Sequence, residues 1–320
     1  MHYTMFVWPH ANARYQMETE KLARAELALT LRRAGVEFCW EEREEICASL
    51  SFETKAPLDA RALELVGRHS LLYGLFARGE EGNLAPLIGR RKPCVGGDLA
   101  GILKYKGKTN EIFTAFLLNM AWLSGAMPER ARLLDPMCGR ATALFVGANL
   151  GWDVCGSDID RGDLREAEGF FKRYLQYHRF KYALTHSSLT LPGKKSAPCA
   201  QFTFQQRTLR LAEMDASRVR EAFGREKFDL VCADLPYGVQ HAPTMPLEKL
   251  LEKCLPAWRE VLCRGGAMAV SFNVHTLRAQ RVREAMRACG LRVMEGEAYD
   301  ALAHWVEQAV TRDVAVAVRD

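Results

Sequence analysis

The residues with the clearest chemical meaning are an acid, a rigid turn and an aromatic ring in the tetrapeptide Asp234-Leu235-Pro236-Tyr237. The apolar run 228–233 before it is typical of a buried strand, and open α/β sheets bind ligands at the carboxyl ends of such strands. A carboxylate and a backbone carbonyl that accept both N–H bonds of a nucleobase amino group would aim its lone pair at an electrophile. The tyrosine ring can stack on the base. A strand followed by an ordinary proline turn is the alternative explanation.

A second segment predicts a cofactor site. Residues 133–142 are typical of a strand, a tight glycine turn and the start of a helix, which Gly151 would end. The next apolar run ends at Asp158, about 20 residues after Gly139. This pattern is how a doubly wound fold holds a nucleoside-containing cofactor, because glycine lets the backbone approach the ligand and the acid binds a ribose hydroxyl. The dinucleotide and P-loop motifs are absent, which disfavours NAD and nucleoside triphosphates.

Together these motifs resemble those of class I S-adenosylmethionine (SAM) methyltransferases. Asp135-Pro136-x-x-Gly139 is similar to their motif I, and the tetrapeptide at 234–237 is similar to the [DNS]-P-P-[YF] motif of amino-group methyltransferases. The order of the motifs, and leucine in place of the first proline, resemble the branch that methylates guanine N2 in tRNA, the relatives of THUMP-domain enzymes. The resemblance covers residues 100–318, approximately.

The resemblance implies a site for SAM and for a nucleobase that has been unstacked into the cleft. The residues implied to bind the cofactor are Thr109, Asn110, Asp135, Pro136, Cys138, Gly139, Thr142, Asp158 (on the ribose) and Asp215 (near the adenine). The implied catalytic residues are Asp234 and Leu235, whose carboxylate and carbonyl accept the amino protons, Pro236, which fixes the turn, and Tyr237, which stacks on the base. Substrate contacts are expected from Lys106, Lys108, Arg91 and Gln240. Cys138 can equally be a small residue that fills space in the turn.

The chain departs from the family pattern in two places. Ala141 stands where the family usually has a second glycine, and its methyl group would narrow the cofactor loop. Residues 106–111 lie where the family has its motif X, which lines the methionine end of the cofactor. Only about 25 residues separate them from the N-terminal module, whereas a THUMP domain of ordinary domain size needs on the order of 100. An RNA substrate would therefore be bound without that domain.

The composition fits an enzyme with one large and one small domain. The chain has 320 residues, no apolar run of 18 residues without charge, and no basic region or cleavage site typical of a signal peptide. Its ten cysteines form no C-x-x-C pair. They therefore indicate reduced thiols, a cytoplasmic location and the absence of a metal site or disulfide framework.

The expected architecture is α/β. Residues 1–78 predict a ferredoxin-like module with the order β-α-β-β-α-β, residues 79–100 a linker, and residues 101–320 the methyltransferase domain. That domain is expected to hold a Rossmann-like sheet of seven strands whose last pair, near 291–295 and 308–318, is antiparallel. Residues 185–206 interrupt the alternation of strands and helices and predict an insertion or mobile loop.

The charge distribution is consistent with RNA, although the net charge is only +5. Basic side chains gather in two segments, Arg90 to Lys108 and Lys172 to Lys195, and aromatic residues are interleaved in the second. Such mixtures suit phosphate contacts and base stacking, but an amphipathic helix with a buried aromatic face is the alternative for the second segment.

Three other functions stay open. A DNA methyltransferase acting on adenine N6 or cytosine N4 uses the same chemistry, although no dedicated sequence-reading domain is apparent. A protein-glutamine methyltransferase uses a similar motif, against which Asp234 argues because asparagine is usual there. A module that binds SAM or RNA without catalysis would be consistent with Ala141. The sequence predicts no oligomeric state.

Overall fold

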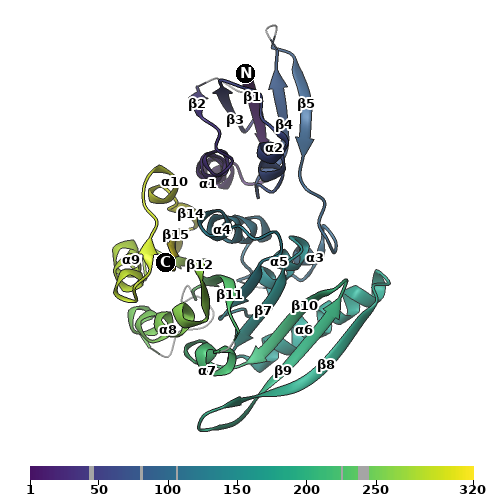
Figure 1. Cartoon of the computed structure of the whole chain (residues 1–320), viewed down its shortest axis with the longest axis vertical. Coiled ribbons are helices and arrows are strands. Elements are labelled where there is room, and N and C mark those ends of the chain that lie inside the picture. Colours follow the sequence, from purple (N-terminus) through teal and green to yellow (C-terminus); the bar gives the residue numbers. More distant parts are fainter. Residues whose placement is uncertain (43–46, 80–81, 106, 225, 237–244) are drawn as a thin grey trace. The chain divides into compact units, whose positions relative to one another are not determined.

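The computed structural model (Figure 1) divides the chain into two compact units. The residues that it describes are 1–42, 47–79, 82–105, 107–224, 226–236 and 245–320. The first unit comprises Met1–Lys92 and Glu295–Asp313, and the second comprises Pro93–Met294 and Val314–Asp320. Residues near the C-terminus thus return to the first unit, which the predicted division at residues 79–100 did not include.

The first unit is built on a five-stranded sheet of the order β2-β3-β1-β4-β5, in which neighbours are antiparallel. Its strands are β1 (His2–Val7), β2 (Phe38–Glu41), β3 (Ser49–Thr54), β4 (Leu72–Arg78) and β5 (Leu84–Gly89). Its helices are α1 (Ala13–Arg33), α2 (Ala60–Gly67) and α10 (Glu297–Asp300). The predicted order β-α-β-β-α-β is present in residues 2–78, while the likeness to a ferredoxin-like domain stays a prediction.

Strand β5 corrects the expectation that residues 79–100 are only a linker. It pairs with β4, with Pro86 opposite Phe76, and lies at the edge of the sheet. An edge strand tolerates proline because one row of its N–H groups has no ladder partner. The glycines and prolines of this segment indicated a loop, and only the neighbouring strand β4 makes it a strand.

Helix α1 organises the rest of the first unit. Its first turn is capped by the Asn12 side chain, which accepts a hydrogen bond from the Tyr15 N–H at 3.1 Å, a common way to satisfy a free helix donor. Arg32 pairs with Glu297 of α10 at 2.6 Å, and the Arg14 guanidinium lies 4.1 Å from the centre of the Trp305 ring in β14 (His304–Glu307). These contacts explain why 295–313 belongs with the N-terminal residues.

The second unit contains a mixed sheet of the order β13-β15-β12-β11-β6-β7-β10-β9-β8, and β14 pairs with β15 beside this path. Its strands are β6 (Arg132–Asp135), β7 (Asp153–Asp158), β8 (Tyr182–Leu191), β9 (Lys194–Phe204), β10 (Arg207–Glu213), β11 (Phe228–Asp234), β12 (Leu262–Asn273), β13 (Arg292–Val293) and β15 (Val310–Val318). Its helices are α3 (Leu99–Ile102), α4 (Glu111–Ser124), α5 (Thr142–Asn149), α6 (Arg161–Tyr177), α7 (Val219–Phe223), α8 (Leu247–Val261) and α9 (Ala279–Ala288). Strands β10, β7, β6, β11 and β12 are parallel, and β13 and β15 are antiparallel. Counted over the described residues and with β14 included, the sheet has ten strands, whereas seven are predicted from the sequence.

The extra strands β8 and β9 replace the predicted insertion or mobile loop at 185–206. They form a long hairpin that continues the sheet beyond β10 (Figure 1). Phe202 and Phe204 of β9 are buried against Phe171 of α6. Their ring centres lie 5.0 and 5.2 Å, respectively, from the ring centre of Phe171. Six of the ten residues of β8 are exposed and five of these six are polar, so the segment lacks the apolar alternation that predicts a half-buried strand.

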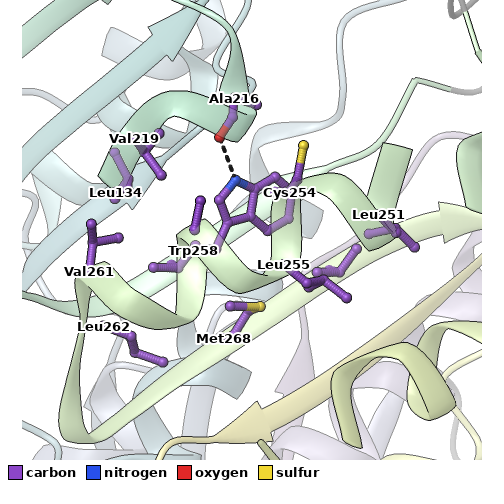
Figure 2. Close-up of a cluster of buried hydrophobic side chains, with 14 of the residues drawn as sticks. Leu134, Ala216, Val219, Leu251, Cys254, Leu255, Trp258, Val261, Leu262 and Met268 are labelled. Carbon is purple, nitrogen blue, oxygen red and sulfur yellow. Dashed lines mark hydrogen bonds between the residues drawn. The ribbon is translucent and has the colours of Figure 1, made fainter. Parts of the chain in front are cut away.

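Helix α8 and its buried tryptophan anchor the middle of this sheet (Figure 2). Trp258 is fully buried and donates its Nε1–H to the Ala216 carbonyl at 2.9 Å. Apolar side chains from the strands and helices around it include Leu134, Val219, Leu251, Leu255, Val261, Leu262 and Met268. Removing such a ring typically costs about 3–5 kcal/mol, so this packing fixes strands β6 and β12, which flank β11.

None of the helices in the described part of the chain is both long and apolar enough to cross a membrane.

Candidate active site

Three acids end three neighbouring parallel strands of the second unit. Asp135 ends β6, Asp158 ends β7 and Asp234 ends β11. The register places Asp135 opposite Gly156, two residues before the end of β7, and β6 also pairs with β11. The carboxyl ends of parallel strands meet at one edge of a sheet, where α/β folds bind ligands. The structure therefore brings together the acids of both sequence motifs.

Asp135 is the most strongly perturbed of these acids. Burial raises its pKa to about 8, and the negative charges of Asp158 and Asp234 add to this effect. The Met137 N–H, which donates to Asp135 Oδ1 at 3.0 Å, acts in the opposite direction. Perturbed acids of this kind cluster at functional sites, because burial and like charges are tolerated where a ligand compensates for them.

Asp158 accepts hydrogen bonds from the glycine turn that follows β6. The Gly139 N–H donates to its Oδ2 at 2.8 Å, and the Asp160 N–H donates to its Oδ1 at 2.9 Å. Burial raises the pKa of Asp158, while these two N–H groups lower it. Each carboxylate oxygen keeps a second lone pair, so the acid can still accept a bond from a ligand hydroxyl.

The glycine turn after β6 packs closely against strand β7. The Cys138 N–H donates to the Ser157 carbonyl at 3.0 Å. A Cβ on Gly156 would lie 2.6 Å from Leu144 and 2.7 Å from the Cys138 sulfur, so only glycine fits there. Burial raises the pKa of the Cys138 thiol well above its usual value. This residue therefore packs as a small neutral side chain in the wall of the turn.

Ala141, the residue in place of the second family glycine, has the backbone conformation that favours glycine. Its φ is 68° and ψ is 27°, in the left-handed region, and its side chain is fully buried at the start of α5. An L-residue other than glycine pays about 1–2 kcal/mol there. The departure from the family pattern is thus accommodated with backbone strain.

Asp234 is held by a second segment of the site. The Thr109 hydroxyl donates a short hydrogen bond to Asp234 Oδ2. The Leu235 N–H donates to the Ser271 carbonyl of β12 at 2.9 Å, and the Leu235 side chain is buried. Pro236 follows, and it is the last described residue before position 245. The predicted site residues Tyr237 and Gln240, like Lys106, lie outside the described residues.

Tyr105 is a site residue that the sequence reasoning missed. Its hydroxyl lies 3.2 Å from the Thr142 hydroxyl at the start of α5, and the Arg140 guanidinium lies 4.6 Å from its ring centre. Burial raises the Tyr105 pKa, and the charges of Asp163 and Asp234 add to this. The only signal in the sequence is an aromatic ring among the lysines of residues 104–108, which were interpreted as RNA contacts.

Arg140 is neutralised within the site. It pairs with Asp163 at 2.8 Å and with Glu166 at 2.9 Å, while its guanidinium covers Tyr105. This long side chain therefore turns toward α6, which carries both acids.

Two residues in the segment before α4, one predicted to contact the cofactor and one the substrate, make hydrogen bonds to other residues of the protein. The Asn110 side chain caps α4, accepting from the Ile112 and Phe113 N–H groups at 2.7 and 3.3 Å. The Lys108 ammonium donates to the Ala100 carbonyl and lies 3.4 Å from Glu111. These contacts stabilise the segment that carries Thr109.

Asp215 follows strand β10, next to β7. It accepts from the Ser217 N–H at 2.8 Å and pairs with Lys253 at 3.1 Å. Burial acts to raise its pKa, but Ser217 and Lys253 outweigh it, so the pKa is lowered. The remaining predicted contact, Arg91, is exposed and belongs to the first unit.

One group of potential metal ligands occurs among the described residues, and it lies in the first unit. The ligand atoms of His2, Glu41 and Glu53 lie within 4.8 Å of one another. Glu41 is already paired with both His2 and Arg78. The positive charge of Arg78 therefore already balances the negative charge of the Glu41 carboxylate. The expectation that the protein holds no metal stays a prediction.

The comparison with protein families decides the identity of the second unit. The model of the family UPF0020, described as an RMKL-like methyltransferase domain, matches residues 116–298, more than half of the chain. The chain belongs to this family. It is a class I SAM-dependent methyltransferase, and SAM is its cofactor.

Solved structures of methyltransferases are also similar to this methyltransferase. TrmN from Thermus thermophilus is 16% identical, with 100% of both chains covered and a TM-score of 0.49. Magnesium protoporphyrin IX methyltransferase from Synechocystis PCC 6803, with bound SAM, is 16% identical over 71% of this chain and 93% of that chain, with a TM-score of 0.42. A search of the curated proteins found no match.

The strand ends of the methyltransferase fit SAM by their chemistry. A Cβ on Gly139 would meet its nearest neighbour, Asp163, only at 3.8 Å, so a ligand can approach the turn. Ribose hydroxyls and the adenine amino group donate hydrogen bonds, which the carboxylates of Asp158 and Asp215 can accept. The sulfonium and ammonium groups of SAM are cations, and the cluster of buried acids favours positive charge.

Proposed function

We propose that this methyltransferase transfers the methyl group of SAM to an exocyclic amino group of a nucleobase in RNA, and that guanine N2 in tRNA is the acceptor. The observation that carries the proposal is the placement of Asp234. It ends β11 beside the buried Asp135, is held by the Thr109 hydroxyl, and is followed by the anchored Leu235 and by Pro236. An acid and a carbonyl next to the cofactor suit the two N–H bonds of an amino group.

In the proposed complex, residues from several strand ends and from the segments beside them bind the cofactor. Asp158 binds the ribose, Asp215 lies near the adenine, and the turn through Pro136, Cys138 and Gly139 forms the wall at its centre. Asp135 faces the cationic part of the cofactor, and Thr142 closes the site with Tyr105. Thr109 and Asn110 contribute by shaping the segment that positions Asp234.

The residues of the chain act on the acceptor by orientation and by proton transfer. The Asp234 carboxylate and the Leu235 carbonyl accept the two N–H bonds, so that the nitrogen lone pair points out of the ring plane. Bound SAM supplies a methyl group whose bond to sulfur breaks as the bond to nitrogen forms. Asp234 then takes the proton that the methylated nitrogen loses. Most of the rate enhancement is expected from this positioning, with Tyr237 stacked on the base.

The acceptor is proposed from charge and motif. Exposed cations in the second unit include Lys172, Arg173, Arg179 and Lys181, near Tyr177, which is 84% exposed. Of the aromatic residues in this segment, Phe170, Phe171 and Tyr174 are buried, as the alternative of an amphipathic helix predicted. Arg91, Lys106 and Gln240 are proposed to contact RNA. Lys108, whose ammonium donates to Ala100, is expected to act by holding the segment in place.

The function is tested by label transfer from methyl-tritiated SAM to separate pools of unmodified tRNA, ribosomal RNA, DNA and protein, followed by nucleoside analysis. Label in tRNA as N2-methylguanosine is the expected result. Label in DNA or in protein would keep the chemistry of the site and overturn the RNA acceptor. No label in any pool, with SAM still bound, would favour a non-catalytic module.

The role of Asp234 is tested separately. Asp234→Ala is expected to abolish methyl transfer, because it removes the acceptor of an N–H bond and of the proton, and to leave the Kd for SAM nearly unchanged. Asp229→Asn is the matched control, since Asp229 lies in the same strand and pairs with Arg132 at 3.3 Å. Loss of SAM binding in the Asp234 variant would contradict the assigned role.

A further inference from the structure

A second cluster of aromatic and basic side chains lies in the first unit. The rings of Trp8 and Tyr73 have centres 5.7 Å apart at a tilt of 58°, and the Arg90 guanidinium lies 5.4 Å from the centre of the Trp8 ring. We call these three residues the Trp8 platform. No residue of the platform takes part in the methyl-transfer site described above.

The platform forms where three strands of one sheet end or begin. Trp8 follows β1, and its N–H donates to the Leu71 carbonyl at 2.7 Å. Tyr73 is the second residue of β4, where the pairing with β1 is irregular. Arg90 follows directly after β5. Because the outermost pair of β4 and β5 joins Gly74 to Gly89, the residues just beyond this pair, Tyr73 and Arg90, come to the same end of the sheet.

The rings of the platform are not explained by the core of the unit. Tyr73 is 58% exposed and Arg90 is exposed, while Trp8 is half-buried. Trp40 makes a useful contrast, because a guanidinium also covers it, that of Arg24 at 4.4 Å. Trp40, however, packs edge-on against Phe38 and the fully buried Phe52, whereas the ring partner of Trp8 is itself open to solvent.

The chain segment that carries Arg90 is basic. Arg90, Arg91 and Lys92 are consecutive and exposed. The sequence from 82 to 97 contains no acidic residue. A ligand that offers both a flat ring and a phosphate matches this chemistry, because a base can stack on the aromatic face while the cations neutralise the backbone.

We infer that the Trp8 platform binds an unpaired nucleotide of an RNA, with the base stacked on one of the two tilted rings and edge-on to the other, and with the neighbouring phosphates on Arg90, Arg91 and Lys92. The inference rests on the proposed function in that it takes the ligand to be RNA. It extends that function by assigning a contact with single-stranded RNA to the unit that does not carry out the chemistry.

The test measures binding of the full chain to a fluorescein-labelled, single-stranded 12-nucleotide RNA and to unmodified tRNA by fluorescence anisotropy. Trp8→Ala and Tyr73→Ala are expected to weaken binding about 5- to 150-fold, the range for loss of one stacked base. Trp8→Phe, which keeps a stacking ring, should recover most of the affinity. Leu87→Ala is the control, because Leu87 is an exposed apolar residue of β5 and its loss removes apolar surface without removing a ring.

The outcomes separate this inference from the proposed function. Wild-type label transfer to tRNA with unchanged RNA affinity in Trp8→Ala and Tyr73→Ala would overturn the platform alone. RNA binding that depends on Trp8, together with methyl transfer only to DNA or protein, would support the platform and overturn the proposed acceptor. Weakened binding of the Trp8 variant to phosphatidylcholine–phosphatidylglycerol vesicles, with RNA affinity unchanged, would assign the platform to a membrane surface and overturn the inference.

Discussion

At the scale of single residues, Asp135 couples the site to pH. Its pKa of about 8 lies above the ordinary value of 3.8 because burial and the charges of Asp158 and Asp234 disfavour the ionised form. The folded state therefore binds more protons than the unfolded state between about pH 4 and pH 8. The free energy of unfolding should fall as the pH rises through this window, by at most about 1.4 kcal/mol per pH unit, and level off above it.

Urea unfolding without SAM at pH 5 to 9 checks this prediction. Asp135→Asn removes the titrating group and should flatten the dependence over the same window. Asp229→Asn, in a solvent-accessible ion pair of the same sheet, should leave the slope as in the wild type. An unchanged slope in the Asp135 variant would assign the pH dependence to other groups.

Also at the residue scale, the Thr109 hydroxyl is expected to orient Asp234. Thr109→Val removes the donor to Asp234 and should lower kcat about tenfold, the effect of roughly 1.4 kcal/mol on the barrier. The Kd for SAM should stay within about threefold, and Thr109→Ser should restore kcat. Thr114→Val is the control one turn away, since the Thr114 hydroxyl donates to the Asn110 carbonyl at 3.0 Å. Equal losses in the two valine variants would indicate general damage to the segment.

At the scale of elements, the start of helix α5 carries a testable strain. Ala141 and Ala148 are both fully buried alanines, but only Ala141 has a left-handed backbone. Substitution of either by glycine removes one buried methyl group. At position 141 the change also relieves strain of about 1–2 kcal/mol, whereas inside the helix it costs about 1 kcal/mol more.

Ala141→Gly should therefore be more stable than Ala148→Gly by at least about 1 kcal/mol, and Ala141→Val, which is β-branched, should be destabilised by about 2 kcal/mol or more. Urea unfolding of the three variants gives these differences. A less stable glycine at 141 than at 148 would contradict the strained conformation.

At the scale of the whole molecule, the reactivity of the ten cysteines reports on which parts of the fold are accessible to solvent. All are free thiols: Cys39 and Cys47 are exposed, Cys94, Cys263 and Cys289 are intermediate, and the other five are buried. Burial raises the pKa of the buried thiols, to about 12 for Cys254 and well above its usual value for Cys138. The thiolate is the reactive form, so buried thiols should be doubly protected.

Reaction with an aromatic disulfide reagent at pH 8 should modify two thiols rapidly, three slowly and five only after unfolding. Mass spectrometry of peptides identifies them, and the same reaction in urea gives the total of ten. Rapid modification of Cys138 in the folded protein would show that the glycine turn opens, which its packing against Gly156 excludes.

The local features of this protein could be predicted from its sequence. The turn at 135–142, the acid that ends β7 and the acid that ends β11 each depend on a few consecutive residues, because strand, glycine turn and helix start are set by short-range geometry. The family model matches the residues in which those motifs lie. The order of the elements in residues 2–78 was predicted for the same reason.

Other features were decided only by tertiary structure. Strand β5 contains Pro86 and is a strand because β4 pairs with it, and β8 is mostly polar and is a strand because β9 does. Residues 295–313 belong with the first unit because α1 contacts them through Arg32 and Arg14. Tyr105 and the Trp8 platform depend on contacts between residues far apart in the chain. Pairing and burial are properties of such contacts, so the sequence by itself determined the motifs, and the tertiary structure decided which residues accompany them.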